Sequence, residues 1–390
     1  MSKTTHPVIQ LAGVCFAFAA QTALAQRIPL RPCTEERLPF PVGCIVMQSA
    51  PFKNIELTPG MNVHAVDGQL VLSWLGPAEK VSLTTVEFHD PLPLVAEDLR
   101  QVVIRYAGAS RFNSPVYVNV TRDGRTVQEQ ANFLGPDAIR VRNIPETPGD
   151  VIDFGQALPQ ARVWLPPKYQ AGQRYPIVYV ADGGDNRGAL VAGAISKGEL
   201  EPVIVVGVEA CAKRETDQRC RLQHYIEENS GPDVARFLAY ERFFIHTLVP
   251  KVEGTYGKPV DATQRAITGY SAGGAWAASM ALRHPELFGR SIAMSPSPPM
   301  LYRIPPKTGT VFAMSGGELE PTFSIHAQCF AGAISDAGGT ASLRLYPAGH
   351  SEPMWTQEFM AAMKDWLGIP RPQIKPAPSR PSWCSLFSKV

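Results

Sequence analysis

The segment from Gly269 to Gly273 reads Gly-Tyr-Ser-Ala-Gly, and its central Ser271 is the first candidate for chemistry in this chain. A short strand is predicted over Arg265–Thr268, and a helix follows from Gly273 to about Arg283. In this context, G-x-S-x-G is typical of a nucleophile elbow, in which a tight strand-to-helix turn exposes a serine hydroxyl. A chance glycine-serine turn is the alternative. We expect Ser271 to act as a nucleophile.

A serine hydroxyl needs a base to attack a carbonyl at neutral pH, and in such folds the chain order is serine, acid, histidine. Three histidines follow Ser271. His284 lies at the far end of the predicted helix, and His326 lies inside another predicted helix. His350 follows a predicted strand, on a loop at the edge of the sheet where sites lie in open α/β folds. We therefore expect His350 to be the base.

Two acids occur in the loop after the strand predicted over Thr310–Met314. We expect Glu320 to orient His350, and Glu318 is the alternative. Either glutamate could instead be a charge that the N-terminus of the next helix favours.

An oxyanion hole needs two backbone N–H groups. The amide of Ala272, directly after the serine, is the first candidate. The second is Gly183, in the loop that follows the strand predicted over Ile177–Ala181, where Asp182 is expected to stabilise the turn. This chemistry requires no cofactor, and no Cys-x-x-Cys or Cys-x-x-His spacing indicates a metal site.

Elements of two kinds must position these residues. From residue 146 to 370, strands alternate with helices, which predicts a mostly parallel sheet covered by helices on both faces, an α/β fold. Residues 26–145 have a β texture, with Asp67-Gly68 and Asp123-Gly124 as hairpin turns, and predict a small sandwich-like all-β domain. Residues 371–390 form a proline-rich tail.

Residues 1–25 have the plan of a secretory signal peptide: Lys3, an apolar stretch that includes Cys15, and a small-x-small end at Ala23–Ala25. A buried N-terminal helix is the alternative. Six cysteines remain after signal removal, an even number that predicts disulfides in an exported, periplasmic or secreted chain; free buried thiols are the alternative. Proximity favours Cys33–Cys44 and Cys211–Cys220, which would leave Cys329 and Cys384 to tie down the tail.

The 390 residues carry a formal net charge of only +2, which argues against nucleic acid or an anionic membrane as the main partner. No internal apolar run of about 18 residues appears, so we expect no membrane span. The partner that remains is a small-molecule substrate, and the oligomeric state stays open.

The segment from about Ala161 to Leu367 resembles the putative esterase family of α/β-hydrolases, which contains esterase D, feruloyl esterases, enterobactin (enterochelin) esterases and mycolyltransferases. The resemblance is carried in chain order by Val163–Tyr169, Tyr179–Gly183, Gly269–Gly274, His284–Gly289, Gly317–Pro321 and Gly349–Ser351, with Trp355 downstream. The Gly-x-x-Glu-Pro and Gly-His pieces are most similar to the enterobactin esterases. The resemblance implies the α/β-hydrolase fold, esterase activity, and catalytic roles for Ser271, Glu320 and His350.

One part of the chain departs from that family. Many relatives have Arg-x-x-Glu-Tyr where this chain has Arg221-Leu-Gln-His224-Tyr225, which puts the usual loop anchoring in doubt. Five side chains are candidates for lining a substrate pocket, and they would suit an aromatic or siderophore-type ester: Tyr270, Trp276, Tyr225, Arg221 and Trp355. Core packing is the alternative for Trp276.

Three hypotheses of function follow. The first is an exported serine esterase that works through an acyl-enzyme. The second is acyl transfer to a sugar or lipid alcohol with the same residues. The third is a non-catalytic binding protein on the same fold.

Overall fold

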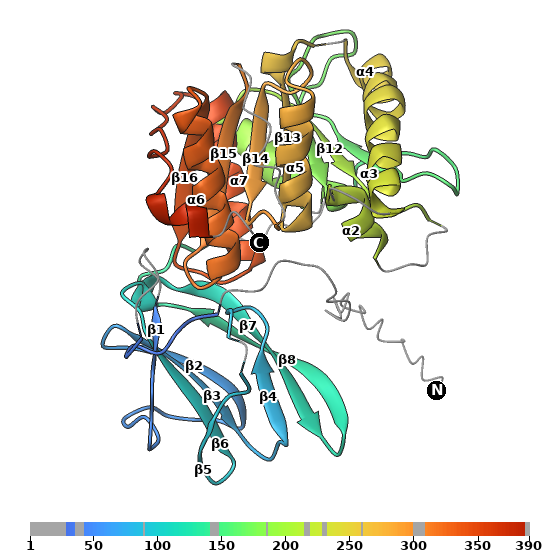
Figure 1. Ribbon diagram of the computed structural model, residues 1–390. Coiled ribbons are helices and arrows are strands. Elements are labelled where there is room, and N and C mark those ends of the chain that lie inside the picture. The colour runs from blue at the N-terminus through green and yellow to red at the C-terminus, as the bar shows by residue number, and fades with distance from the viewer. Residues whose placement is uncertain are drawn as a thin grey trace, which may run out of the picture.

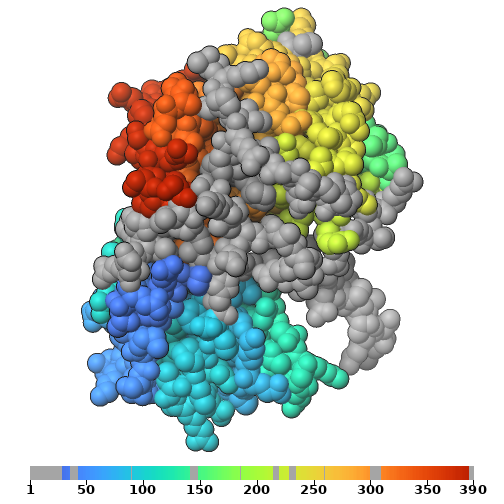
Figure 2. All heavy atoms as spheres, viewed as in Figure 1, coloured from blue at the N-terminus to red at the C-terminus, as the bar shows by residue number. Residues whose placement is uncertain are grey.

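The computed structural model describes residues 29–35, 43–88, 90–140, 148–184, 186–213, 219–227, 232–258, 260–298 and 309–386. The predicted signal peptide lies outside these residues. The described chain forms two antiparallel sheets from its N-terminal part and one large sheet flanked by helices (Figure 1). In the space-filling view the N-terminal sheets make up the lower part of the molecule and the helix-flanked sheet the upper part (Figure 2).

The N-terminal part is built from antiparallel strands. One sheet contains β1 (Cys44–Val46), β6 (Leu99–Arg105), β3 (Gln69–Leu75) and β2 (Gly60–Val66) in that order, with β5 (Leu94–Ala96) paired to β6; the other contains β4 (Lys80–Leu83), β7 (Asn113–Arg122) and β8 (Arg125–Leu134). Both predicted hairpins are present. Asp67-Gly68 and Asp123-Gly124 have positive φ at both positions, as two-residue hairpin turns require.

One hydrophobic core joins the two N-terminal sheets. Alternate residues of β7, namely Val116, Val118 and Val120, pack with residues of β3 and β6 such as Leu72 and Ile104, and all five are buried. The opposite residues of β7 are partly exposed, so the strand shows the period of two expected of a half-buried sheet. The predicted sandwich-like all-β part is therefore confirmed.

The large sheet has eight strands, in the order β16 (Thr340–Tyr346), β15 (Val311–Gly317), β14 (Arg290–Met294), β13 (Arg265–Tyr270), β11 (Ile177–Ala181), β12 (Ile204–Val208), β10 (Ala161–Trp164) and β9 (Asp150–Ile152). The strands from β16 to β12 run parallel, and β10 and β9 are antiparallel to their neighbours. The mostly parallel sheet that the sequence predicts is confirmed. The carboxyl ends of β11, β13, β14, β15 and β16 meet at one edge.

Helices cover both faces of this sheet. One face packs against α3 (Pro232–Phe243), a π-helical turn over Phe244–Leu248, α4 (Val249–Tyr256), α5 (Ala272–Arg283) and α6 (Pro321–Asp336). The other face packs against α1 (Arg187–Ser196) and α7 (Glu352–Leu367). Residues 177, 179 and 181 of β11 belong to the first layer and residues 178 and 180 to the second, as buried strand alternation requires. The short α2 (Cys220–Tyr225) contacts α3 and α5.

Short 3₁₀ turns complete the described structure, at Ala109–Arg111, Asp182–Gly184, Ala262–Gln264 and Ser382–Leu386. No helix within the described ranges combines the length and the apolar character that a bilayer crossing needs.

Three disulfides join the six cysteines as Cys33–Cys44, Cys211–Cys220 and Cys329–Cys384. The pairing expected from proximity is therefore confirmed, and Cys384 does tie the tail to α6. Disulfides of this number are typical of chains that fold in an oxidising compartment.

Candidate active site

Ser271 lies at a sharp turn between β13 and α5. Its backbone has φ 55° and ψ −125°, a conformation that non-glycine residues rarely adopt. Its amide donates to the carbonyl of Met294 at 2.9 Å, which holds the turn in place. A Cβ at Gly269 would lie 2.4 Å from the carbonyl oxygen of Gly273, so the turn closes only because glycine stands there. This geometry is the nucleophile elbow that the sequence pattern predicts.

His350 and Glu320 meet at the carboxyl edge of the sheet. The His350 Nδ1 atom lies 2.5 Å from Glu320 Oε2, in a hydrogen bond that joins the loop after β16 to the loop after β15. Glu320 is fully buried, and its other oxygen, Oε1, accepts from Ser295 Oγ and from the Gly317 amide, both at 2.5 Å. A carboxylate held by three donors is fixed in position and orients the imidazole ring.

Ser295 and Trp355 complete this network. The Trp355 indole N–H donates to Ser295 Oγ at 2.9 Å, and that hydroxyl in turn donates to Glu320. Ser295 has a positive φ of 42° directly after β14. No sequence pattern pointed to Ser295, because a lone serine after a strand has no distinctive spacing.

The hydroxyl of Ser271 faces a second serine. Its Oγ lies 3.4 Å from Ser297 Oγ, and the Ser297 amide donates to the Ser271 carbonyl at 3.0 Å. Among the described residues, Ser297 is the hydrogen-bond partner of the Ser271 side chain. The Ser271 hydroxyl is therefore not hydrogen-bonded to His350 in this structure. Nucleophile–base hydrogen bonds are often long in free enzymes and tighten in the complex with substrate.

Glu318, the alternative acid, points elsewhere. Its Oε2 accepts a 2.5 Å hydrogen bond from the hydroxyl of Tyr106, which follows β6 in the N-terminal sheets. Burial and the neighbouring Glu318 carboxylate raise the pKa of Tyr106 far above its ordinary value, so this phenol stays protonated and donates. The structure therefore brings Glu320, and not Glu318, to His350.

The loop after β11, which carries the candidate oxyanion-hole donor Gly183, has an unusual backbone conformation. Asp182 and Gly183 both have positive φ, 57° and 73°, and a Cβ at Gly183 would lie 2.5 Å from the Glu209 carboxylate. Arg221 donates to both oxygens of Asp182, at 2.7 and 2.8 Å, and the Asp182 amide donates to the Tyr225 hydroxyl at 3.0 Å. Arg221 and Tyr225 thus anchor this loop, although the family's glutamate is missing.

His224 stands where relatives have that glutamate, and it anchors a different segment. Its Nδ1 lies 2.7 Å from the carbonyl oxygen of Ala210, and its ring stacks on Tyr240 with centroids 5.1 Å apart. The Cys211–Cys220 disulfide closes the loop between Ala210 and α2. The departure from the family pattern put the usual anchoring in doubt, and in the structure Arg221, bonded to Asp182, and the Cys211–Cys220 disulfide supply anchoring here.

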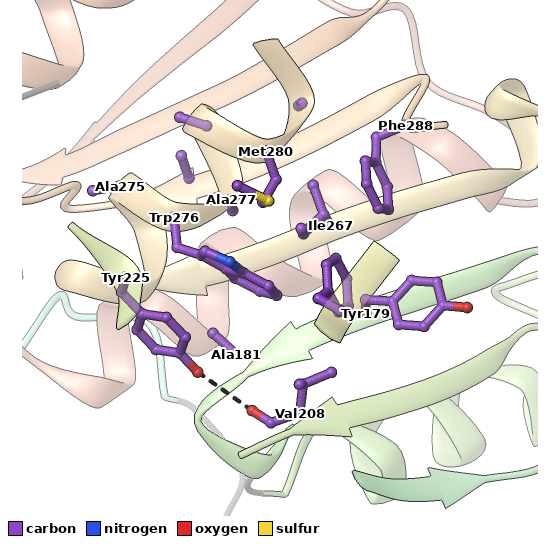
Figure 3. Close-up of a cluster of buried hydrophobic side chains, with 14 of the residues drawn as sticks. Tyr179, Ala181, Val208, Tyr225, Ile267, Ala275, Trp276, Ala277, Met280 and Phe288 are labelled. Carbon is purple, nitrogen blue, oxygen red and sulfur yellow. Dashed lines mark hydrogen bonds between the residues drawn. The ribbon is translucent and has the colours of Figure 1, made fainter. Parts of the chain in front are cut away.

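Two of the five candidate pocket residues lie in the core. Trp276 and Tyr225 are fully buried and stack on each other at 5.2 Å, and the Tyr225 hydroxyl donates to the Val208 carbonyl (Figure 3). Their burial favours a packing role over the pocket-lining role we expected. Arg221 is also engaged, by its ion pair with Asp182.

Aromatic rings surround His350. Trp355 packs edge-on to the imidazole at 4.7 Å and stacks on Tyr270, the residue before the serine, at 4.2 Å. Phe323, on the first turn of α6, packs against the imidazole with ring centroids 4.2 Å apart and is partly exposed. No sequence pattern pointed to Phe323, whose only signal is its place three residues after Glu320.

The other two histidines that follow Ser271 in the chain have different surroundings. His284 hydrogen-bonds Glu241 of α3 at the end of α5, and His326 is buried in α6, where burial lowers its pKa to about 4.

Comparisons with known proteins find an esterase family match for part of the chain. Residues 157–324 match the family described as "Putative esterase". The chain is 30% identical over 139 residues to the uncharacterized protein YjcH of Bacillus subtilis strain 168, which is 34% of this chain and 54% of YjcH. The chain thus spans about half the length of this curated relative.

Solved structures show the same fold. The enterobactin esterase Fes from Shigella flexneri, solved with enterobactin, has a TM-score of 0.57 at 16% identity and covers 78% of this chain and 95% of its own. The same enzyme, solved with 2,3-dihydroxy-N-benzoyl-serine, has a TM-score of 0.59 at 15% identity, and the match covers 85% of this chain and 97% of the esterase. Ferric enterobactin esterase from Salmonella typhimurium has a TM-score of 0.57 at 16% identity, and the match covers 78% of this chain and 95% of the esterase. Residues 157–324 of this chain therefore match the putative esterase family, and the chain shares the fold of the similar Fes structures, an α/β-hydrolase fold.

Proposed function

We propose that this protein is an exported serine esterase that uses Ser271, His350 and Glu320. The observation that carries the proposal is the buried Glu320–His350 hydrogen bond on the loops that neighbour a strained serine elbow. The family match and the disulfides support it, the first for ester hydrolysis and the second for an oxidising compartment such as a periplasm or the cell exterior.

The proposed mechanism begins when Ser271 Oγ turns from Ser297 toward His350. His350 Nε2 takes the hydroxyl proton while Oγ attacks the ester carbonyl, and Glu320 stabilises the imidazolium through Nδ1–H. The amides of Ala272 and Gly183 are our candidates for binding the oxyanion. Collapse expels the alcohol, which takes the proton from His350. Water then attacks the acyl-enzyme by the same steps, releasing the acid and restoring Ser271.

An aromatic ester suits this site best. Phe323, Trp355 and Tyr270 place three aromatic rings along the path from the serine elbow to His350, and an aromatic acyl group could pack against them. The similar Fes structures were solved with enterobactin or a dihydroxybenzoyl compound, which gives siderophore-type esters a place among the candidate substrates.

The test is activity of variants on p-nitrophenyl acetate. Ser271→Ala and His350→Gln should each lower kcat by roughly 10⁴-fold or more, because each removes a member of a unit that works together. His246→Gln changes an exposed histidine on the π-helical turn and serves as the matched control. The proposal would be refuted if the Ser271→Ala protein kept the parental activity. It would also be refuted if a fluorophosphonate probe labelled the variant as strongly as it labels the parent.

Substrate class needs a second experiment. A panel of acetyl, feruloyl and catecholate-siderophore esters should show higher kcat/KM for the aromatic members. Product analysis with and without an alcohol acceptor separates hydrolysis from acyl transfer, the second reaction that these residues could support.

A further inference from the structure

Glu320 begins a helix that it does not cap. It is the N-cap residue of α6, yet its side chain makes no capping hydrogen bond. An acidic N-cap side chain ordinarily accepts from the second or third helical amide, because the first amides of a helix lack internal partners. Here the carboxylate turns away and accepts from Ser295, Gly317 and His350 instead. Two partners therefore compete for Glu320: its own helix and the histidine.

A residue from the connection between β4 and β5 takes over the capping role. Glu87 Oε2 accepts a 2.6 Å hydrogen bond from the amide of Thr322, the second residue of α6. The first residue, Pro321, has no amide proton, so Thr322 carries the first N–H of the helix that needs a partner. Glu87 is 235 residues away in sequence and only 5% exposed, and its negative charge sits at the positive end of the helix dipole.

The segment around Glu87 is held firmly on both sides. The hydroxyl of Thr85 accepts from the amide of Tyr117 in β7, which fixes the segment to the N-terminal sheets. The Glu87 amide donates to the Leu319 carbonyl at 3.0 Å, and the fully buried Leu319 side chain belongs to the core of the N-terminal sheets. The acid loop is thus anchored by residues on either side of Glu320.

The same segment also holds the histidine loop. The His350 amide donates to the Thr85 carbonyl at 3.0 Å, and a Cβ at Gly349 would lie 2.5 Å from that carbonyl oxygen. Glycine at position 349 therefore permits a close approach between the N-terminal sheets and the loop that carries the base.

We propose that Glu87 is a positioning residue for the Glu320–His350 pair. By accepting from the first amide of α6, it leaves the Glu320 carboxylate available to hold His350 Nδ1–H. Without this cap, Glu320 would turn toward its own helix and release the imidazole from its fixed tautomer. The inference rests on the proposed function, since it assigns Glu87 a role in that same site.

The experiment replaces Glu87 and observes His350 directly. In Glu87→Ala and the similarly sized Glu87→Leu, kcat for p-nitrophenyl acetate should fall about 10- to 100-fold at nearly unchanged KM, a loss typical of residues that orient a catalytic group. By NMR, the far-downfield His350 Nδ1–H resonance should weaken relative to the parent. Glu87→Gln keeps an accepting oxygen and should restore both properties.

Tyr106→Phe is the matched control, because it removes a hydrogen bond to Glu318 across the same contact surface without touching the start of α6. The positioning role is overturned if folded Glu87→Ala or Glu87→Leu keeps the parental His350 resonance, or if Tyr106→Phe changes that resonance equally. It is also overturned if both variants fail to fold, because Glu87 would then serve stability. The NMR measurement does not require an active enzyme. Its outcome is therefore independent of the Ser271→Ala test of the proposed function.

Discussion

Glu318 and Glu320 are two residues apart, yet their side chains meet different parts of the molecule. Glu318 accepts from Tyr106 of the N-terminal sheets, whereas Glu320 accepts from His350. Leu319 between them enters the core of the N-terminal sheets, and Glu318 and Leu319 form a turn in which the Glu320 amide donates to the Gly317 carbonyl at 3.2 Å. This turn directs Glu318 and Leu319 toward the N-terminal sheets and Glu320 toward His350.

The first prediction separates the two glutamates. Glu320→Gln should lower kcat by about 10²- to 10⁴-fold, because an amide cannot hold the imidazole in the same tautomer or stabilise its charged form. Glu318→Gln should keep kcat within about threefold, since the amide oxygen still accepts from Tyr106. The measurement is kcat/KM on p-nitrophenyl acetate for both proteins. Equal losses in the two variants would contradict the assignment.

At the scale of elements, a charged cluster joins the end of α5 to α3. His284 Nε2 lies 2.7 Å from Glu241 Oε1, and Arg283 donates to both oxygens of the same carboxylate at 2.6 and 3.0 Å. Burial raises the pKa of Glu241, but hydrogen bonds from His284 and Arg283 outweigh it and lower the pKa to about 2. The hydrogen bond to Glu241 raises the pKa of His284, against the opposite effect of burial. The helix that presents Ser271 is therefore tied down by titratable groups.

The second prediction concerns the pH dependence of stability. Because the pKa of His284 is higher in the folded state, its stabilising effect is complete below about pH 6.5, its ordinary pKa, and is lost as the pH rises through the raised value. The free energy of unfolding should therefore fall as the pH rises through this range. In the His284→Gln variant it should fall by less than in the parent. Denaturant unfolding at a series of pH values measures this, with the exposed His246→Gln as control. A parental pH slope in His284→Gln would contradict the expectation.

At the scale of the whole molecule, the N-terminal sheets and the helix-flanked sheet meet at the loops that carry Glu320 and His350. Contacts cross from Thr85, Glu87 and Tyr106 to residues between 318 and 350. The C-terminal tail is fastened separately, by the Cys329–Cys384 disulfide on α6. Long-range links of these two kinds hold α6 between the N-terminal sheets and the tail.

The third prediction follows from the lengths of the loops that the disulfides close. Cys329 and Cys384 are 55 residues apart, and Cys211 and Cys220 are 9 apart. Chain entropy gives about 4 kcal/mol for the first and about 3 kcal/mol for the second. Replacing the first pair by serines should therefore lower the free energy of unfolding more than replacing the second, and a reductant should lower the melting temperature of the parent. A larger loss from the shorter loop would contradict this account.

The sequence by itself was sufficient for features that depend on local chemistry and chain order. The elbow around Ser271, the hairpin turns at Asp67-Gly68 and Asp123-Gly124, and most strand positions follow from residues close together in the chain. The choice of His350 follows from the order of elements in an α/β sheet. Such features are predictable because backbone conformation and strand alternation are set by neighbours.

The tertiary structure alone decided which side chains meet. It turned Trp276 and Tyr225 into the core, brought Phe323 over His350, selected Glu320 over Glu318, and set Glu87 at the start of α6. The contacts of Glu318 and Glu87 depend on how the N-terminal part packs against the loops that carry Glu320 and His350, between residues up to 235 positions apart. No local pattern encodes such contacts, because they arise from the packing of whole surfaces.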